Sequence, residues 1–131
     1  MKKTTLYLSW ALQILCAIIL LQTLFFKFSG AEESVYIFDK VGLGAVGRIG
    51  TGIAEMFTSI LLLIPATAWL GAILGIGLMA GAIMSHLTIL GIEVMGDGGY
   101  LFALGLIVLL GCVTVLYTRR KQIPVLGARL K

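Results

Sequence analysis

The sequence predicts an all-α integral membrane protein: a four-helix bundle with one short interfacial helix between its first and second membrane spans. Two observations support this prediction. Hydrophobic residues make up 60% of the 131 residues and charged residues only 12%, and the mean hydropathy is +1.08. The apolar residues also gather into four runs, each close to the ~20 residues with which a helix crosses a bilayer. A soluble domain of this size could not bury so much apolar surface.

A single domain, residues 1–131, is expected to hold four spans, at about residues 6–26, 45–64, 68–92 and 100–117. The first run is longer than the ~7–15 apolar residues of a secretory signal, so it is interpreted as a span. The alternative is a cleaved signal peptide, because Lys2 and Lys3 precede the run and small residues follow it. Pro65 begins a tight link between the second and third spans, and residues 96–99 form a glycine-rich turn before the fourth.

The segment between the first two spans predicts a short helix over residues 31–41. Its apolar residues Val35, Phe38 and Val41 recur every three positions, and Gly42 supplies a stop. Such a helix lies with its apolar side in the membrane surface. We expect it at the outer interface.

The basic residues predict the orientation. An even number of spans puts both termini on one side, and seven of the ten Lys and Arg residues lie near those termini. Positive charge gathers on the cytoplasmic side, so we expect a multi-pass protein of the cell (inner) membrane with both termini in the cytoplasm. The formal charge of +4 is then explained by contact with anionic lipid. The seven residues are Lys2, Lys3, Arg119, Arg120, Lys121, Arg129 and Lys131.

Two ligand classes are not expected. No basic stripe with interleaved aromatic residues is present, so nucleic acid is not an expected partner. Residues 42–47 spell GxGxxG, but the nucleotide motif needs a preceding strand and an acidic residue about 20 positions later, and neither is present. Glycine here indicates close packing of helices instead. In the third span, two faces of small residues predict two helix contacts: Gly71, Gly75, Ala82 and Ser85, and Gly77, Gly81 and Thr88.

The two cysteines, Cys16 and Cys112, lie inside apolar runs and form no CxxC pair. Counted from the inner ends of their spans, they lie about 15 Å and about 8 Å deep at 1.5 Å per residue. That difference disfavours a disulfide, so two free, buried thiols are predicted.

Ionisable residues interrupt the spans at a shared depth. Arg48 and Glu55 lie on one face of the second span, and Lys27 ends the first. Glu55 lies about 12 Å from the outer end of its span and His86 about 9 Å from the outer end of the third. A lone carboxylate near the bilayer centre costs about 3 kcal/mol, so a shared, partly hydrated pocket is expected in the outer half. The pocket candidates are Lys27, Arg48, Glu55, Ser85 and His86.

Within this pocket, Glu55 and His86 are predicted to face each other, bonded directly or through one water. The short link at Pro65 makes the second and third spans antiparallel neighbours, which brings the two residues to one level. The alternative is that these polar groups only hydrogen-bond helix to helix, with Arg48 an ordinary flanking residue. No catalytic residue and no metal ligand is expected, because the sequence shows no nucleophile with its base and no metal cluster.

Several stretches resemble the DoxX-like family of membrane proteins. These are "GRIGTGIAEMFTSILLLIP", the Ser-His-Leu-Thr of the third span, the acidic glycine-rich turn, and the basic "TRRKQIP" tail. The resemblance covers nearly the whole chain and implies a four-helix integral membrane protein. The family takes its name from subunits linked to quinone-dependent sulfur oxidation. The cysteine motifs of the four-helix disulfide-forming quinone reductases are missing here, which disfavours a thiol-oxidising role.

The leading hypothesis is an accessory subunit of a redox or quinone-linked membrane system, whose pocket binds a small apolar or quinone-like molecule. Another membrane or redox subunit is then the expected partner, beside membrane lipid. A small transporter that uses Glu55 and His86 as a proton relay is the second hypothesis. A purely structural subunit of a membrane complex is the third. Whether the chain is an enzyme stays open, since no cofactor motif is visible.

Overall fold

The computed structural model describes residues 2–123, and within that range the chain is all-helical. The basic residues Arg129 and Lys131 lie outside the described residues. A π-helical turn, His86–Leu90, continues α4, and four of the helices are long and apolar enough to cross a membrane. The prediction of an all-α chain with four long apolar helices is therefore confirmed. The helices are α1 (Lys3–Ser29), α2 (Glu32–Val41), α3 (Gly44–Leu63), α4 (Ala68–Ser85) and α5 (Tyr100–Thr118).

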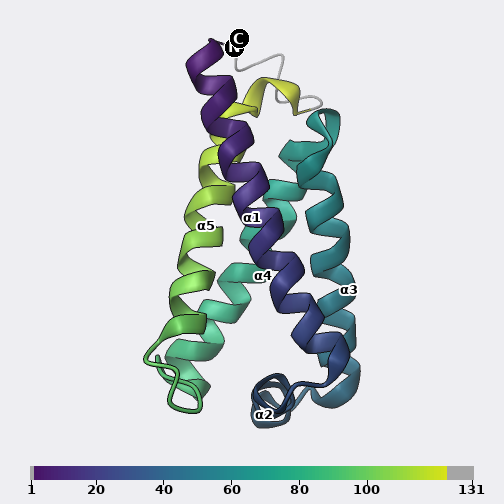
Figure 1. The fold of residues 1–131 in the computed structure, drawn as a ribbon, viewed down its shortest axis with the longest axis vertical. Coiled ribbons are helices and arrows are strands. Elements are labelled where there is room, and N and C mark those ends of the chain that lie inside the picture. Colours follow the sequence, from purple (N-terminus) through teal and green to yellow (C-terminus); the bar gives the residue numbers. More distant parts are fainter. Residues whose placement is uncertain (1, 124–131) are drawn as a thin grey trace.

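The four long helices form a closed ring. α1 and α4 each pack against both α3 and α5, so α1 and α4 lie diagonally opposite one another. α1 begins and α5 ends at the same end of the bundle, which we call the terminal end (Figure 1). The short helix α2 and the turn between α4 and α5 lie at the opposite end, which we call the α2 end.

The short helix α2 exists where the sequence predicts it. It stops at Gly42, whose φ of 91° is left-handed and suits glycine. Its first turn carries Glu32 and Glu33, which stabilise the positive end of a helix dipole.

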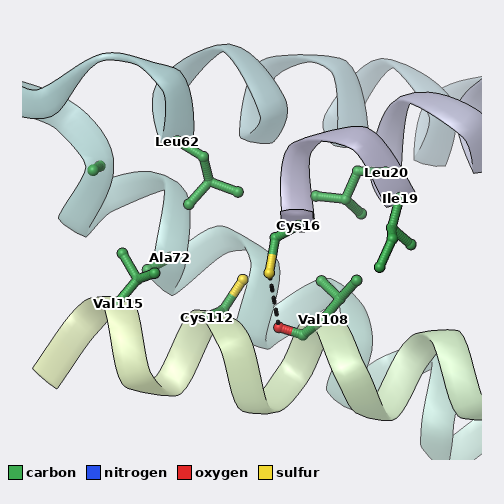
Figure 2. Close-up of a cluster of buried hydrophobic side chains, with 9 residues drawn as sticks. Cys16, Ile19, Leu20, Leu62, Ala72, Val108, Cys112 and Val115 are labelled. Atoms are coloured by element: carbon green, nitrogen blue, oxygen red, sulfur yellow. Dashed lines mark hydrogen bonds between the residues drawn. The ribbon is translucent and has the colours of Figure 1, made fainter. Parts of the chain in front are cut away.

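The hydrophobic core fills the terminal half of the bundle. Its residues come from the middle of α1, the end of α3, the start of α4 and the second half of α5. Figure 2 shows Cys16 and Ile19 on α1 facing Cys112 and Val108 on α5, with Val115 further along α5 beside Ala72. Glycine residues of α4 allow its backbone to approach the neighbouring helices closely. A Cβ added at Gly71 would lie 2.8 Å from the backbone nitrogen of Leu62, and one at Gly75 would lie 2.6 Å from the Cys112 sulfur.

The two small-residue faces of α4 therefore have different roles. Gly71 and Gly75 make the predicted close helix contacts. The second face is not a packing surface, because a Cβ added at Gly77 or at Gly81 would meet no atom within 4 Å. The prediction that this helix contacts two neighbours is confirmed, since α4 packs against both α3 and α5. The assignment of one contact to the Gly77 and Gly81 face is wrong, because small residues permit close packing but also leave room for a hollow.

Both cysteines are free and fully buried, as predicted, but the argument from their depths is wrong. Their sulfur atoms lie side by side between α1 and α5 (Figure 2). Nε of Arg119 donates to Ser9 Oγ over 3.1 Å, which sets the register of the two helices. Each cysteine is seven residues from its member of that pair. α1 extends beyond the end of α5 at the terminal end, so depths counted from the helix ends were not comparable.

Candidate functional site

A cavity of about 730 Å³ occupies the half of the bundle at the α2 end. Its walls come from the end of α1, from α2, from the first half of α3, from the end of α4 and from the start of α5. Pockets of about 300–1,000 Å³ with mostly apolar walls and a few polar groups are typical of small-molecule sites. Four of the five candidate residues line this cavity: Lys27, Glu55, Ser85 and His86.

Glu55 and Lys27 form an ion pair on the cavity wall. The Lys27 Nζ atom lies 2.7 Å from Glu55 Oε1, and Thr23 Oγ1 donates to Glu55 Oε2 over 2.5 Å. The Glu55 side chain is only 1% exposed. α1 and α3 pack side by side, and both charged residues lie on the faces that these helices turn toward each other. A buried carboxylate needs such partners, because an isolated charge in this environment is strongly disfavoured.

Arg48 does not line the cavity, so its assignment to the pocket is corrected. Its Nη1 donates instead to the backbone carbonyl oxygen of Lys27, in the last turn of α1. The last carbonyls of a helix have no intrahelical donor, and a cation is favourable at that negative end. Arg48 is in the first turns of α3, close enough to the α1 end for its long side chain to reach back. It therefore acts as a cap on α1.

His86 is the first residue of the π-helical turn, and it is bonded to Gly91, the residue directly after the turn. Its Nδ1 lies 3.0 Å from the carbonyl oxygen of Gly91, and its own carbonyl oxygen accepts from the Gly91 N–H over 2.7 Å. Since a carbonyl can only accept, Nδ1 carries the hydrogen of this contact. The ring packs against Phe102 with 5.6 Å between centroids. π-helical turns are frequent at functional sites.

Glu55 and His86 line the same cavity but do not bond to each other. Glu55 is bonded to Lys27 and Thr23, and the His86 ring is bonded to Gly91. The direct form of the predicted pairing is therefore wrong, because each group bonds to another partner, and the form through one bridging water stays a prediction. Ser85 also lines the cavity, and its hydroxyl donates to the Gly81 carbonyl oxygen of the same helix over 2.9 Å.

The cavity also contains polar residues that were not among the candidates. Thr23 lies one helical turn before Lys27, on the same face of α1, and this spacing was a usable signal. Glu32 and Glu33 reach the cavity from α2. The sequence pattern predicts the helix α2, but it does not predict that α2 lies over the spans and lines a cavity with them. Burial and the nearby charge of Asp97 raise the pKa of Glu33 above its usual value.

A second buried polar cluster lies at the terminal end, away from the cavity. Arg119 is only 2% exposed. Its Nε donates to Gln13 Oε1 over 2.8 Å as well as to Ser9, and the Gln13 amide donates to the Leu62 carbonyl oxygen over 2.7 Å. Trp10 covers the guanidinium, whose carbon lies 5.6 Å from the ring centroid. This cluster ties α1 to α3 and α5. We interpret it as structural, because its hydrogen bonds join three helices and its side chains Ser9 and Gln13 are fully buried.

Metal chemistry finds no support in the described part of the chain, where no group of three or more His, Cys, Asp or Glu side chains could hold an ion. The comparisons with protein-family models, with curated proteins and with solved structures found no match. The site is therefore characterised by its own geometry: a largely apolar cavity with the Lys27–Glu55 ion pair and a histidine on its walls.

Proposed function

We propose that the cavity binds a small, uncharged, quinone-like molecule, and that the chain is a DoxX-like accessory subunit of a redox or quinone-linked membrane system. The observation that supports this most directly is the Lys27–Glu55 ion pair on the wall of an otherwise apolar cavity. Because these two charges cancel, the pair itself offers no net charge to an ionic head group, and the carboxylates of Glu32 and Glu33 at the α2 end disfavour an anionic one. The site offers hydrogen bonds to a neutral head group.

The donors present suit carbonyl oxygens. The Lys27 ammonium has three N–H donors. Glu55 is the partner of one of them, which leaves two for a ligand. Ser85 and His86 lie on the wall formed by the end of α4, but their hydrogens are donated to the carbonyl oxygens of Gly81 and Gly91, so the donor for a ligand is the ammonium of Lys27. A flat ring with carbonyl groups can accept from this ammonium while its body lies against the apolar residues Ile19, Leu20 and Val108. The protein's part is to bind and orient the molecule, so electron transfer requires a partner subunit.

The proposed setting is the cell (inner) membrane, with the terminal end in the cytoplasm and α2 at the outer interface. The distribution of charge along the bundle supports this. Lys2, Lys3, Arg120 and Lys121 lie at the terminal end, and Glu32, Glu33 and Asp97 lie at the α2 end. Positive charge concentrates on the cytoplasmic side of membrane proteins. The apolar residues of α2 suit a helix that lies in the membrane surface.

Binding of a soluble quinone analogue with a short tail tests the proposal. Purified protein in detergent is titrated with the analogue, and the free analogue is measured by equilibrium dialysis. Lys27→Met removes the ammonium donors, so we expect the dissociation constant to rise at least about tenfold, as for a lost hydrogen bond to a charged group. Lys121→Met, on the exposed surface, is the matched control. Equal affinity in wild type and Lys27→Met would contradict the proposal.

Proton-coupled transport is the second candidate function. It is favoured by two titratable groups, Glu55 and His86, on the wall of one cavity within the apolar helices. A proton flux in liposomes that is lost in Glu55→Gln and His86→Phe, without binding of the analogue, would support transport. Neither flux nor binding, with a stable heteromeric partner, would support a purely structural subunit.

A further inference from the structure

A second hollow lies on the outside of the bundle, in the seam between α3 and α4. It has a volume of about 440 Å³ and is lined by Ala54 and Phe57 on α3 and by Ile73 and Leu74 on α4. Its lining is almost entirely apolar, and the lining side chains of Phe57, Ile73 and Leu74 are exposed on the outside of the bundle. We call it the seam groove.

The seam groove and the cavity share two wall residues, Gly77 and Leu78. The two hollows therefore meet at one turn of α4. At Gly77 the wall carries no side chain, and a Cβ built there would meet no atom within 4 Å. The cavity and the apolar groove thus adjoin at a position of α4 that has no side chain between them.

We propose that the ligand has a long hydrocarbon tail, that its head group lies in the cavity, and that its tail leaves beside Gly77 and lies along the seam groove. This inference rests on the proposed function and specifies its ligand class: a lipid-soluble molecule with a neutral polar head, such as a quinone with an isoprenoid tail. Such a ligand enters sideways from the bilayer. Its tail never has to cross the polar surface at the α2 end, where Glu32 and Glu33 lie.

The physical reason is the contrast between the two ways out of the cavity. A tail that left the cavity at the α2 end would pass the carboxylates of Glu32 and Glu33, where its apolar surface would not be buried. The seam groove leads past Ala54, Phe57, Ile73 and Leu74, where a hydrocarbon chain keeps close contacts on the protein side. The tail is accommodated without any change in the helices, since the groove is already present.

The test compares two quinone analogues with one head group, one with a short and one with a long isoprenoid tail. Both are titrated against protein in lipid nanodiscs. Ala54→Phe fills the seam groove with a residue that does not line the cavity, and Gly77→Leu closes the junction. Gly50→Leu, at an exposed glycine of α3 that lines neither hollow, is the matched control.

We expect wild type and Gly50→Leu to bind both analogues. Ala54→Phe should weaken the long-tailed analogue at least about tenfold and leave the short-tailed one within about twofold, while Gly77→Leu should weaken the long-tailed analogue more than the short-tailed one. Equal loss, or no loss, of both analogues in Ala54→Phe would overturn the tail path while binding of the short analogue upheld the proposed function. A phospholipid retained in the groove, with no discrimination between the analogues, would also overturn it. Failure of both analogues to bind wild type would overturn the proposed function itself, and this inference with it.

Discussion

The Lys27 ammonium lies 2.7 Å from the Glu55 carboxylate. The backbone carbonyl of the same lysine is bonded to the other charged residue of α3. Arg48 donates to the Lys27 carbonyl oxygen. The two charged residues of α3, Arg48 and Glu55, thus both contact Lys27 near the end of α1. This arrangement explains how two full charges are held in an apolar segment. The buried carboxylate is paired with the Lys27 ammonium, and the arginine caps a helix.

The ion pair predicts a strong coupling between its two members. Lys27→Met or Glu55→Gln alone leaves a buried group without its partner, and each is expected to destabilise the fold by about 3–5 kcal/mol. The double variant removes both charges and should recover most of that loss. Thermal unfolding in detergent, read as a double-mutant cycle, measures the coupling. Additive effects of the two single changes would show that the pair does not exist in the folded protein.

Arg48 is predicted to affect stability but not ligand binding. Arg48→Met removes the cap on α1 and should lower the free energy of unfolding by about 1 kcal/mol, as loss of a terminal hydrogen bond does. Because Arg48 lies outside the cavity, the dissociation constant of the short-tailed analogue should stay within about twofold of wild type. Arg120→Met, which removes a basic residue at the far end of the bundle, is the control. A large loss of affinity in Arg48→Met would return this residue to the pocket.

Asp97 predicts a pH dependence of stability. Its Oδ1 accepts from the backbone N–H of Val94 over 3.0 Å and of Gly99 over 2.8 Å, and its Oδ2 accepts from Leu101 over 3.2 Å. Burial acts to raise the pKa of Asp97, but these three donors and the nearby His86 lower it below its usual value. A carboxyl whose pKa is lower in the folded state stabilises the fold above its unfolded pKa, and this stabilisation is lost as pH falls through the folded pKa.

Asp97→Asn should therefore destabilise the protein by on the order of 1 kcal/mol at neutral pH. The gap between variant and wild type should close in acid, where the wild-type carboxyl is protonated. Melting temperatures at neutral and acidic pH measure this. The exposed Asp39 supplies the control variant, Asp39→Asn. A gap of the same size at both pH values would show that the charge of Asp97 is not responsible.

The cysteines are predicted to be free as isolated and to be oxidisable together. Alkylation of the denatured protein without reductant should label both Cys16 and Cys112. Because their sulfur atoms lie side by side, a mild oxidant that enters the membrane should join them within one chain, detected by mass spectrometry as a loss of two hydrogens. Cys16→Ser is the control and should show no such product. Persistence of two labelled thiols after oxidation would contradict the observed placement of α1 against α5.

Much of the fold could be predicted because its determinants are local. The four spans are runs of apolar residues, and Gly42 ends α2 at the expected position. The site could be predicted only in part. A helical face gives the direction of Arg48 and Glu55, but it does not show which group each side chain reaches, so the cap and the ion pair could not be told apart.

The remaining errors come from relations between helices. The small residues of α4 have one spacing but two environments, since Gly75 packs against Cys112 and Gly81 borders a hollow. Arg119 has the position of a flanking residue in the sequence. Arg119 is buried because α1 extends beyond the end of α5, so that Ser9 and Gln13 of α1 lie against the Arg119 side chain.

The central claim is that the cavity holds a quinone-like molecule, and the most direct measurement is extraction of the purified protein followed by mass spectrometry. Gly81 borders the cavity with open space in front of it, so Gly81→Leu fills the cavity without disturbing a packed contact. Wild type and the control Gly50→Leu are predicted to carry a quinone-like lipid in near one-to-one amount, and Gly81→Leu to carry at least about tenfold less. Equal amounts of the same lipid in all three proteins, or no such lipid in wild type, would contradict the account.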